Sequence, residues 1–235
     1  MVFEKLEKRI IISGTIEAVT PLHIGSGRSE IEVGEVDLPV LTTPDGQPYI
    51  PGSSLKGRVR AEAERIARQN GAEVCKPPDV KEMCGSKKQS TDEFCICCRI
   101  FGSAGNISLA SKVKFRDSYP LEKVETLLER TGIAIDREKG TVAKGALYTI
   151  QAVPAGTKFS LEIVAENMSG EELKLLKAAL KSVQDSALGG SSTRGFGKVK
   201  FVIESVRERT AGYYLGKENE KIMAGAELQR WLDMI

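Results

Sequence analysis

The chain has 235 residues, a formal net charge of +2 at pH 7 and 41% hydrophobic residues. This length can bury a substantial core, and no apolar run approaches the roughly 18 residues that a membrane-spanning helix needs. The first residues carry charges where a signal peptide requires an apolar stretch, so we expect a cytoplasmic protein that makes no contact with a membrane.

The first half of the chain predicts two strands with a helix between them. Residues 9–19 are rich in β-branched side chains and predict a strand. After a glycine-punctuated loop and a Pro44-Asp45-Gly46 turn, apolar residues at helical spacing predict a helix from about 52 to 70. Gly52-Ser53-Ser54 is the predicted N-terminal cap of this helix. Residues 111–120 predict a further short strand.

The second half repeats this order after an insertion. Residues 131–150 place Asp, Arg and Gly between apolar pieces and predict a protruding hairpin or loop. Residues 156–166 alternate with period two and predict a strand, and Ser169 caps an amphipathic helix. Residues 188–206 form a glycine-rich loop and another strand, whereas the pattern weakens after Thr210.

This succession predicts an α+β fold with a ferredoxin-like (RRM-like) βαββαβ core. In such a core, two helices cover one face of an antiparallel sheet. No linker divides the chain, so we expect one domain over residues 1–235, with a Cys-rich insertion at 71–100 and a protruding hairpin at 128–152.

All five cysteines lie in one window of the sequence. Disulfides are disfavoured in a chain without an export signal. The C-x-x-C pair Cys95 and Cys98, together with Cys75 and Cys84, therefore predicts a tetrahedral structural zinc site. Cys97 is then spare, although it could replace a neighbour. The alternative is a mixture of disulfides and free thiols.

A glycine-rich loop at 189–197 is the first candidate phosphate site. Its glycines let a ligand approach the backbone, its hydroxyls add donors, and an arginine suits bidentate phosphate contact. The candidate residues are Gly189, Gly190, Ser191, Ser192, Arg194, Gly195 and Gly197. The alternative is a tight turn between helix and strand.

The start of the first helix, at 51–60, is the second candidate. Free N–H groups at a helix N-terminus favour anions, and basic side chains follow. The candidate residues are Ser53, Ser54, Lys56, Arg58 and Arg60. The alternative is a solvated basic face. Two such segments in one chain favour a protein that follows a nucleic-acid backbone without reading its sequence.

The sequence limits the catalytic options. A single histidine excludes a two-histidine ribonuclease, and neither a nucleophile elbow nor HExxH is present. Asp37 and Asp136 are the acidic candidates in loops. Asp37 could hold a divalent ion or orient a ribose 2′-hydroxyl, and the alternative is a turn-capping role.

Several motifs together resemble the RAMP superfamily of CRISPR-associated proteins. These motifs are LHIGSG (22–27), IPGSSLKGRVR (50–60), CRIFGSAG (98–105), VKFRDS (113–118) and LGGSSTRGFGKVKF (188–201). Their combination is most similar to the backbone subunit of the type III-A (Csm) effector complex, and the match spans about residues 8–206.

The resemblance implies a subunit that stacks in several copies along a guide crRNA, beside other subunits of the complex. His23 and both candidate phosphate segments would line the guide groove, and residues 128–152 would be a thumb that wedges into the guide–target duplex. Asp37 would cut single-stranded target RNA with a divalent metal, Mg or Mn. Some archaeal relatives carry a zinc-bound Cys cluster where Cys75–Cys98 lies.

Three other functions stay open. They are a structural crRNA-binding subunit without cleavage, the equivalent subunit of a type III-B (Cmr) complex, and a guide-processing endonuclease. A non-cleaving subunit would not need Asp37, and a self-stacking thumb argues against the endonuclease.

Overall fold

A computed structural model describes residues 4–27 and 36–233. Residues 28–35, part of the glycine-punctuated loop predicted from the sequence, lie outside this description. No helix among the described residues has both the length and the apolarity to cross a bilayer. The strands are β1 (Lys8–Ala18), β2 (Val113–Phe115), β3 (Leu128–Asp136), β4 (Thr141–Ala152), β5 (Lys158–Glu166), β6 (Val199–Thr210) and β7 (Lys221–Met223). The α-helices are α1 (Gly52–Gln69), α2 (Cys84–Lys87), α3 (Ile96–Phe101), α4 (Gly170–Asp185), α5 (Ala211–Tyr214) and α6 (Gly225–Asp233).

The fold is mixed α+β with antiparallel sheets. Five strands form the main sheet in the order β2-β5-β1-β6-β7. β1 lies between β5 and β6 and pairs antiparallel with both. A bulge interrupts its pairing with β6 between Ser13 and Gly14. A Cβ at Gly14 would lie 2.0 Å from the Val202 carbonyl oxygen, so only glycine fits this close approach.

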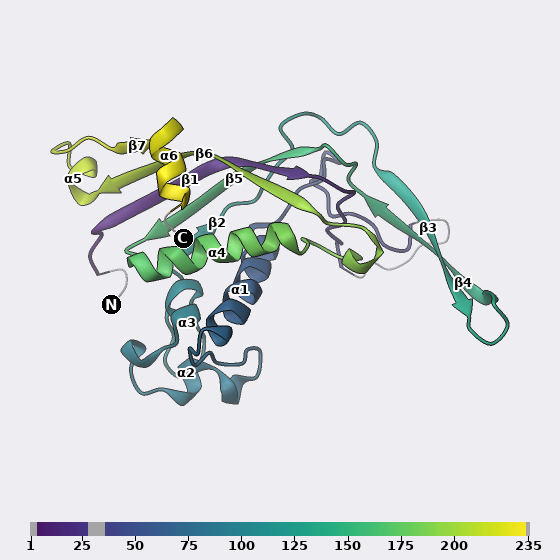
Figure 1. The fold of residues 1–235 in the computed structure, drawn as a ribbon, viewed down its shortest axis with the longest axis horizontal. Helices are drawn as coiled ribbons and strands as arrows, with labels where there is room; N and C mark the ends of the chain where they lie inside the picture. Colours follow the sequence, from purple (N-terminus) through teal and green to yellow (C-terminus); the bar gives the residue numbers. More distant parts are fainter. Residues whose placement is uncertain (1–3, 28–35, 234–235) are drawn as a thin grey trace.

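Helices α1 and α4 lie on one face of this sheet (Figure 1). Alternate residues of β1, among them Ile10, Ile12 and Ile16, point into a core that α1 and α4 close. Ser169 caps α4 as predicted, in a reciprocal capping box with Glu172. Trp231 of α6 is 6% exposed and joins the same core. The weakly patterned tail therefore adds the helices α5 and α6 and the edge strand β7.

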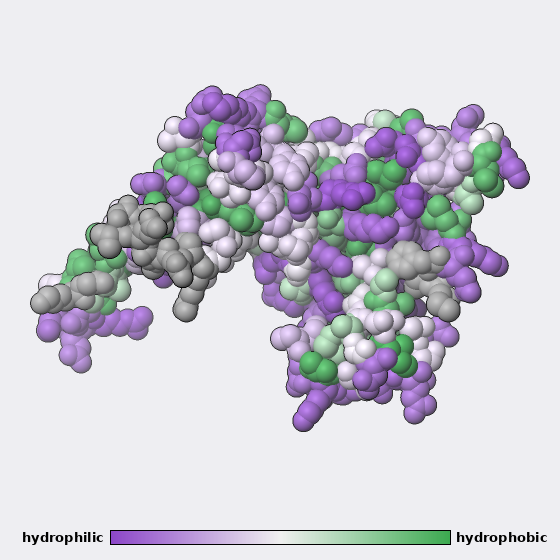
Figure 2. Space-filling view, turned by 180° about the vertical axis from the view of Figure 1, so that it is seen from behind, coloured by the Kyte–Doolittle hydropathy of each residue, from purple (hydrophilic) through white to green (hydrophobic). Residues whose placement is uncertain are grey.

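β3 and β4 form a separate two-stranded hairpin that projects from the body (Figure 1). Directly paired residues share a face of a hairpin. Ile133 pairs with Leu147 and Ile135 with Val142, and all four side chains are exposed. Figure 2 shows apolar residues along this projection and a hydrophilic tip. The hairpin predicted from 131–150 is therefore present and carries an exposed apolar face.

The start of α1 differs from the prediction. Pro51 is the N-cap, and Gly52 already belongs to the helix. The backbone N–H of Gly52 donates to Asp117 Oδ1 at 2.8 Å, so a carboxylate of the chain itself binds the first N–H of the helix. A Cβ at Gly52 would lie 2.1 Å from the Phe115 carbonyl oxygen. This glycine therefore permits close packing against the end of β2.

Candidate functional site

Asp37 is exposed and attached to the base of the hairpin. Its Oδ2 accepts hydrogen bonds from the Thr149 backbone N–H at 2.6 Å and from the Thr149 hydroxyl at 3.1 Å. The Asp37 N–H donates back to Thr149 Oγ1 at 3.2 Å. These hydrogen bonds from Thr149 lower the pKa of Asp37. β4 therefore fixes the ionised carboxylate of Asp37 at the surface. The carboxylate accepts these hydrogen bonds from Thr149, which lies on a different element of the fold from Asp37.

His23 is buried between β4 and the glycine-rich loop. Its Nδ1 lies 2.7 Å from the Gln151 carbonyl oxygen, and the His23 carbonyl accepts a hydrogen bond from the Gly190 N–H at 2.9 Å. The residue is 7% exposed. The Gln151 side chain in turn accepts from the Val40 N–H. His23 therefore joins three segments of the site.

The glycines of the loop have different functions in the structure. A Cβ at Gly189 would lie 2.3 Å from the His23 carbonyl oxygen, and one at Gly197 would lie 2.2 Å from the Leu188 carbonyl oxygen. These two glycines serve close packing within the chain. Gly195 has a φ of +87° and no neighbour within 4 Å of an added Cβ, so it leaves open space beside the backbone. Only part of the loop is therefore free to receive a ligand.

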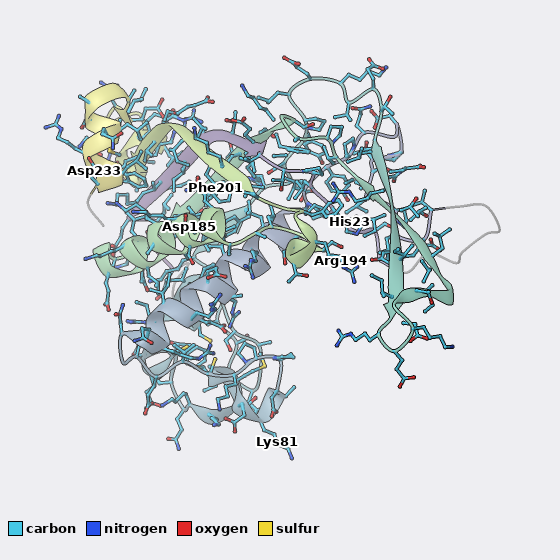
Figure 3. All side chains as sticks on the ribbon, turned by 45° about the vertical axis from the view of Figure 1, so that its right-hand side comes forward. His23, Lys81, Asp185, Arg194, Phe201 and Asp233 are labelled. Atoms are coloured by element: carbon cyan, nitrogen blue, oxygen red, sulfur yellow. The ribbon has the colours of Figure 1, made fainter. Side chains whose placement is uncertain are left out.

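Arg194 lies where the loop meets the hairpin. Its guanidinium stands 5.4 Å from the centre of the Tyr148 ring. Arg130 of β3 stacks over Phe196 at 4.7 Å and reaches the Arg194 carbonyl oxygen at 3.5 Å. Figure 3 shows Arg194 and His23 at this junction, far from Lys81 in the Cys-rich insertion. Arg194, His23 and the base of the hairpin thus belong to one region.

The basic residues at the start of α1 do not form a free basic face. Arg58 donates from Nε to the Ala187 carbonyl at 2.7 Å and from Nη2 to Ser186 Oγ at 2.8 Å, and it pairs with Glu62 at 3.0 Å. A phosphate contact by Arg58 stays a prediction, and internal acceptors already bind its guanidinium. The same contacts bring α1 beside the segment that leads into the glycine-rich loop.

Arg60 also makes contacts within the chain. It pairs with Glu64 at 2.9 Å and points toward the cysteines, where its Nη2 lies 3.6 Å from Cys98 Sγ. Lys56 is half-buried, and burial followed by repulsion from Arg60 lowers its pKa. Ser53 and Ser54 are exposed on the first turn. Lys56 and the two serines remain the candidates on this helix.

Four cysteines converge on one point as predicted. The Sγ atoms of Cys75, Cys84, Cys95 and Cys98 all lie within 4.8 Å of one another, and Cys75 and Cys98 are 3.3 Å apart. Zn–S bonds of about 2.3 Å imply sulfur separations of about 3.8 Å in a tetrahedron, so this set fits a metal ion. Cys97 instead lies in the main core.

The states of the thiols bear on the two alternatives that the sequence leaves open, a zinc site or a mixture of disulfides and free thiols. None of the five cysteines forms a disulfide. Burial raises the pKa of Cys97 to about 12, and Cys97 lies outside the group of four converging sulfur atoms. Hydrogen bonding, first of all with Cys98, lowers the pKa of Cys95 to about 4. Cys97 is thus the spare cysteine.

Sequence reasoning missed the residues that organise the site. Thr149 and Gln151 lie on β4, and Tyr148 faces the opposite side of the same strand. No motif marks them, because their importance depends on which loop lies beside the strand. Thr, Gln and Tyr are ordinary strand residues by themselves.

Comparison with known proteins shows the family of this chain. A model of the RAMP superfamily matches residues 15–200, and the chain belongs to this superfamily. The chain is similar to the CRISPR system Cms endoribonuclease Csm3 of Methanocaldococcus jannaschii, with 35% identity over 92% of this chain and 88% of the relative. It is 32% identical to the Csm3 of Methanothermobacter thermautotrophicus over 95% of this chain and 96% of that one.

A solved structure extends the likeness to the fold. The structure of a Csm3–Csm4 subcomplex in the type III-A CRISPR-Cas interference complex matches with a TM-score of 0.60 and 28% identity. The match covers 98% of this chain and 97% of the other. The resemblance inferred from the motifs is therefore confirmed.

Proposed function

We propose that this chain is a backbone subunit of a type III-A CRISPR effector complex that binds guide crRNA and cleaves complementary target RNA. The fixed, ionised carboxylate of Asp37 at the base of the hairpin carries this proposal. Support comes from relatives that are named endoribonucleases and from a similar protein solved in a Csm3–Csm4 subcomplex. Its partners would be crRNA, target RNA, further copies of itself and other subunits.

The proposal gives each part of the fold a role within one RAMP domain. The succession β1-α1-β2-β5-α4-β6 and the strand order β2-β5-β1-β6 support a ferredoxin-like core. Residues 71–100 are the Cys-rich insertion. Residues 128–152 are a thumb, and the exposed aliphatic face of β3 and β4 suits contact with unstacked bases.

The guide would run past the junction of the glycine-rich loop, α1 and the hairpin. Arg194 would contact phosphate, with the loop residues around Gly195 and the first turn of α1 beside it. Arg58 places these two segments next to each other. His23 would support the backbone of the groove from within, because it is buried against β4. Such contacts follow the RNA backbone and leave sequence to base pairing.

Cleavage would begin when the thumb unstacks a nucleotide and brings its ribose 2′-oxygen in line with the adjacent phosphate. The 2′-oxygen forms a bond to phosphorus as its proton leaves. The bond from phosphorus to the 5′-oxygen breaks, and the 5′-oxygen takes a proton. The products are a 2′,3′-cyclic phosphate and a 5′-hydroxyl. Asp37 would orient the 2′-hydroxyl, and correct positioning can supply about 7 kcal/mol or more of the barrier.

A divalent ion fits this site only together with substrate. Asp37 is a single exposed carboxylate, and among the described residues no acidic cluster surrounds it. Mg²⁺ is commonly held by one or two carboxylates plus substrate phosphates. Asp37 and the RNA phosphate would therefore hold Mg²⁺ or Mn²⁺ jointly. When bound, the ion would stabilise negative charge on the phosphate.

The four clustered cysteines would hold a structural Zn²⁺. The insertion consists mainly of short turns and short helices with a small apolar cluster of its own. A metal supplies the stability that such a segment lacks. The ion would fix the earlier part of the insertion, with Cys75 and Cys84, to α3, which carries Cys98.

Reconstitution tests the proposed function. The purified chain would be combined with crRNA and its partner subunits, and complementary and non-complementary RNA would be added with Mg²⁺ or with EDTA. We expect regularly spaced cuts with 5′-hydroxyl ends in the complementary RNA and no cuts in the non-complementary RNA. Guide binding without cuts would instead establish the structural, non-cleaving subunit. Failure to bind crRNA would contradict both functions.

A further inference from the structure

A network of two arginines and one glutamate joins α1 to the Cys-rich insertion. Glu64, whose side chain is 12% exposed, accepts hydrogen bonds from Arg60 at 2.9 Å and from Arg68 at 3.3 Å. Arg68 also donates to the Cys75 carbonyl oxygen at 3.0 Å. The network therefore reaches the segment that carries the first cysteine of the metal cluster.

Arg60 uses each nitrogen of its guanidinium on a different partner. Nε donates to Glu64, Nη1 donates to the Gly102 carbonyl at 3.1 Å, and Nη2 lies 3.6 Å from Cys98 Sγ. A planar fork with five donors can reach three such partners at once, whereas a lysine is a single point of charge. The geometry therefore depends on arginine as well as on positive charge.

The net charge of a cluster with a bound metal ion explains why a guanidinium beside Cys98 would matter. Four thiolates carry two more negative charges than a divalent ion neutralises. Cys98 is 0% exposed, so water screens its sulfur poorly. A guanidinium beside that sulfur offsets the charge and orients the ligand. Groups of this kind around metal ligands commonly change metal affinity by about 10 to 100-fold when they are removed.

We infer that Arg60, held in place by Glu64, is a positioning residue for a metal ion bound by Cys75, Cys84, Cys95 and Cys98. This inference rests on the zinc site proposed above. It assigns to Arg60 a function at the cluster in place of the RNA contact that its position in the sequence predicts.

Zinc transfer from the purified full-length chain to a colour-forming chelator measures the effect. Arg60→Gln removes both the positive charge and the planar guanidinium group, whereas Arg60→Lys keeps only the positive charge. Arg65→Gln is the matched control, because Arg65 lies on the same helix with a 70% exposed side chain and pairs with Glu62. We expect zinc release about 10 to 100-fold faster in Arg60→Gln, an intermediate rate in Arg60→Lys and the wild-type rate in Arg65→Gln.

Bound Co²⁺ gives a second readout. Its sulfur-to-metal absorption should shift in the Arg60 variants, because the hydrogen bond to Cys98 changes how strongly that sulfur donates. Glu64→Gln, which frees Arg60 without altering it, should shift the spectrum in the same direction and serves if Arg60→Gln does not fold. Zinc release at the wild-type rate and a wild-type Co²⁺ absorption spectrum in both Arg60→Lys and Glu64→Gln would overturn the inference. A wild-type chain that binds neither Zn²⁺ nor Co²⁺ would overturn the metal site itself.

Discussion

Thr149 donates two hydrogen bonds to a single oxygen of Asp37, although 112 positions separate the two residues in the sequence. The carboxylate therefore takes its position from β4. In the proposed mechanism, this carboxylate would therefore act where the hairpin meets RNA. The first two predictions follow from this pair of residues.

Asp37→Ala should abolish cleavage of target RNA and leave crRNA binding unchanged. We expect single-turnover rates to fall by at least about 10²-fold, the contribution typical of a positioned acid–base group. Asp45→Ala is the matched control, because Asp45 is another exposed loop aspartate, in a turn closed by Thr43. Unchanged cleavage in Asp37→Ala would remove Asp37 from the active site.

Thr149→Val should change the pH dependence of cleavage. Hydrogen bonds from Thr149 favour the charged carboxylate and lower the pKa of Asp37, so wild-type activity should persist as the pH falls below the usual carboxylate range. Loss of the hydroxyl donor raises this pKa and moves the acidic limb of the pH–rate profile to higher pH. Thr131→Val, on the residue paired with Thr149 across the hairpin, is the control. Coincident limbs in Thr149→Val and wild type would contradict the prediction.

Arg194→Gln should weaken crRNA binding equally for all guide sequences. Loss of one phosphate contact lowers the slope of log affinity against log salt by about 0.7 on single-stranded RNA. Arg230→Gln is a suitable control, because Arg230 is also exposed but lies on α6, away from the hairpin (Figure 1). Affinities for crRNA, measured at salt concentrations from low to moderate, give this slope. An unaltered slope in Arg194→Gln would place the guide elsewhere.

Arg58→Gln should destabilise the fold. The substitution leaves Glu62 with a weaker partner and frees the Ala187 carbonyl. The Arg58 side chain is 34% exposed, so we expect a loss of only about 1–2 kcal/mol in the free energy of unfolding. Urea unfolding measures it, and Arg65→Gln should change stability by less than about 0.5 kcal/mol. A lower salt slope with unchanged stability would instead restore the phosphate contact predicted for Arg58.

Purified protein should contain about one zinc per chain. Cys95→Ser should reduce this content, because it removes a ligand from the cluster. Cys97→Ser should retain the metal and lose stability, since Cys97 is 0% exposed in the main core. Elemental analysis and thermal unfolding separate the two effects. Metal-free wild-type protein that remains folded would contradict the zinc site.

Local patterns in the sequence determined most of the elements and the cluster of four cysteines. Helical spacing from Leu55 onward predicts α1, and Ser169 marks the start of α4. These signals act over a few residues, so a single segment contains them. The four cysteines are also recognisable, because their chemistry is specific and few other residues compete for the same role.

Tertiary structure alone decided what the charged and flexible residues do. The sequence presents Arg58 and Arg60 as one basic face, yet one binds the end of α4 and the other the cysteine cluster. Gly189 and Gly195 look alike in sequence, but only Gly189 lies against another backbone segment. A side chain's partner depends on strand register and helix crossing, which bring together residues that are distant in the chain. Asp37 and Thr149 therefore meet only in the folded molecule.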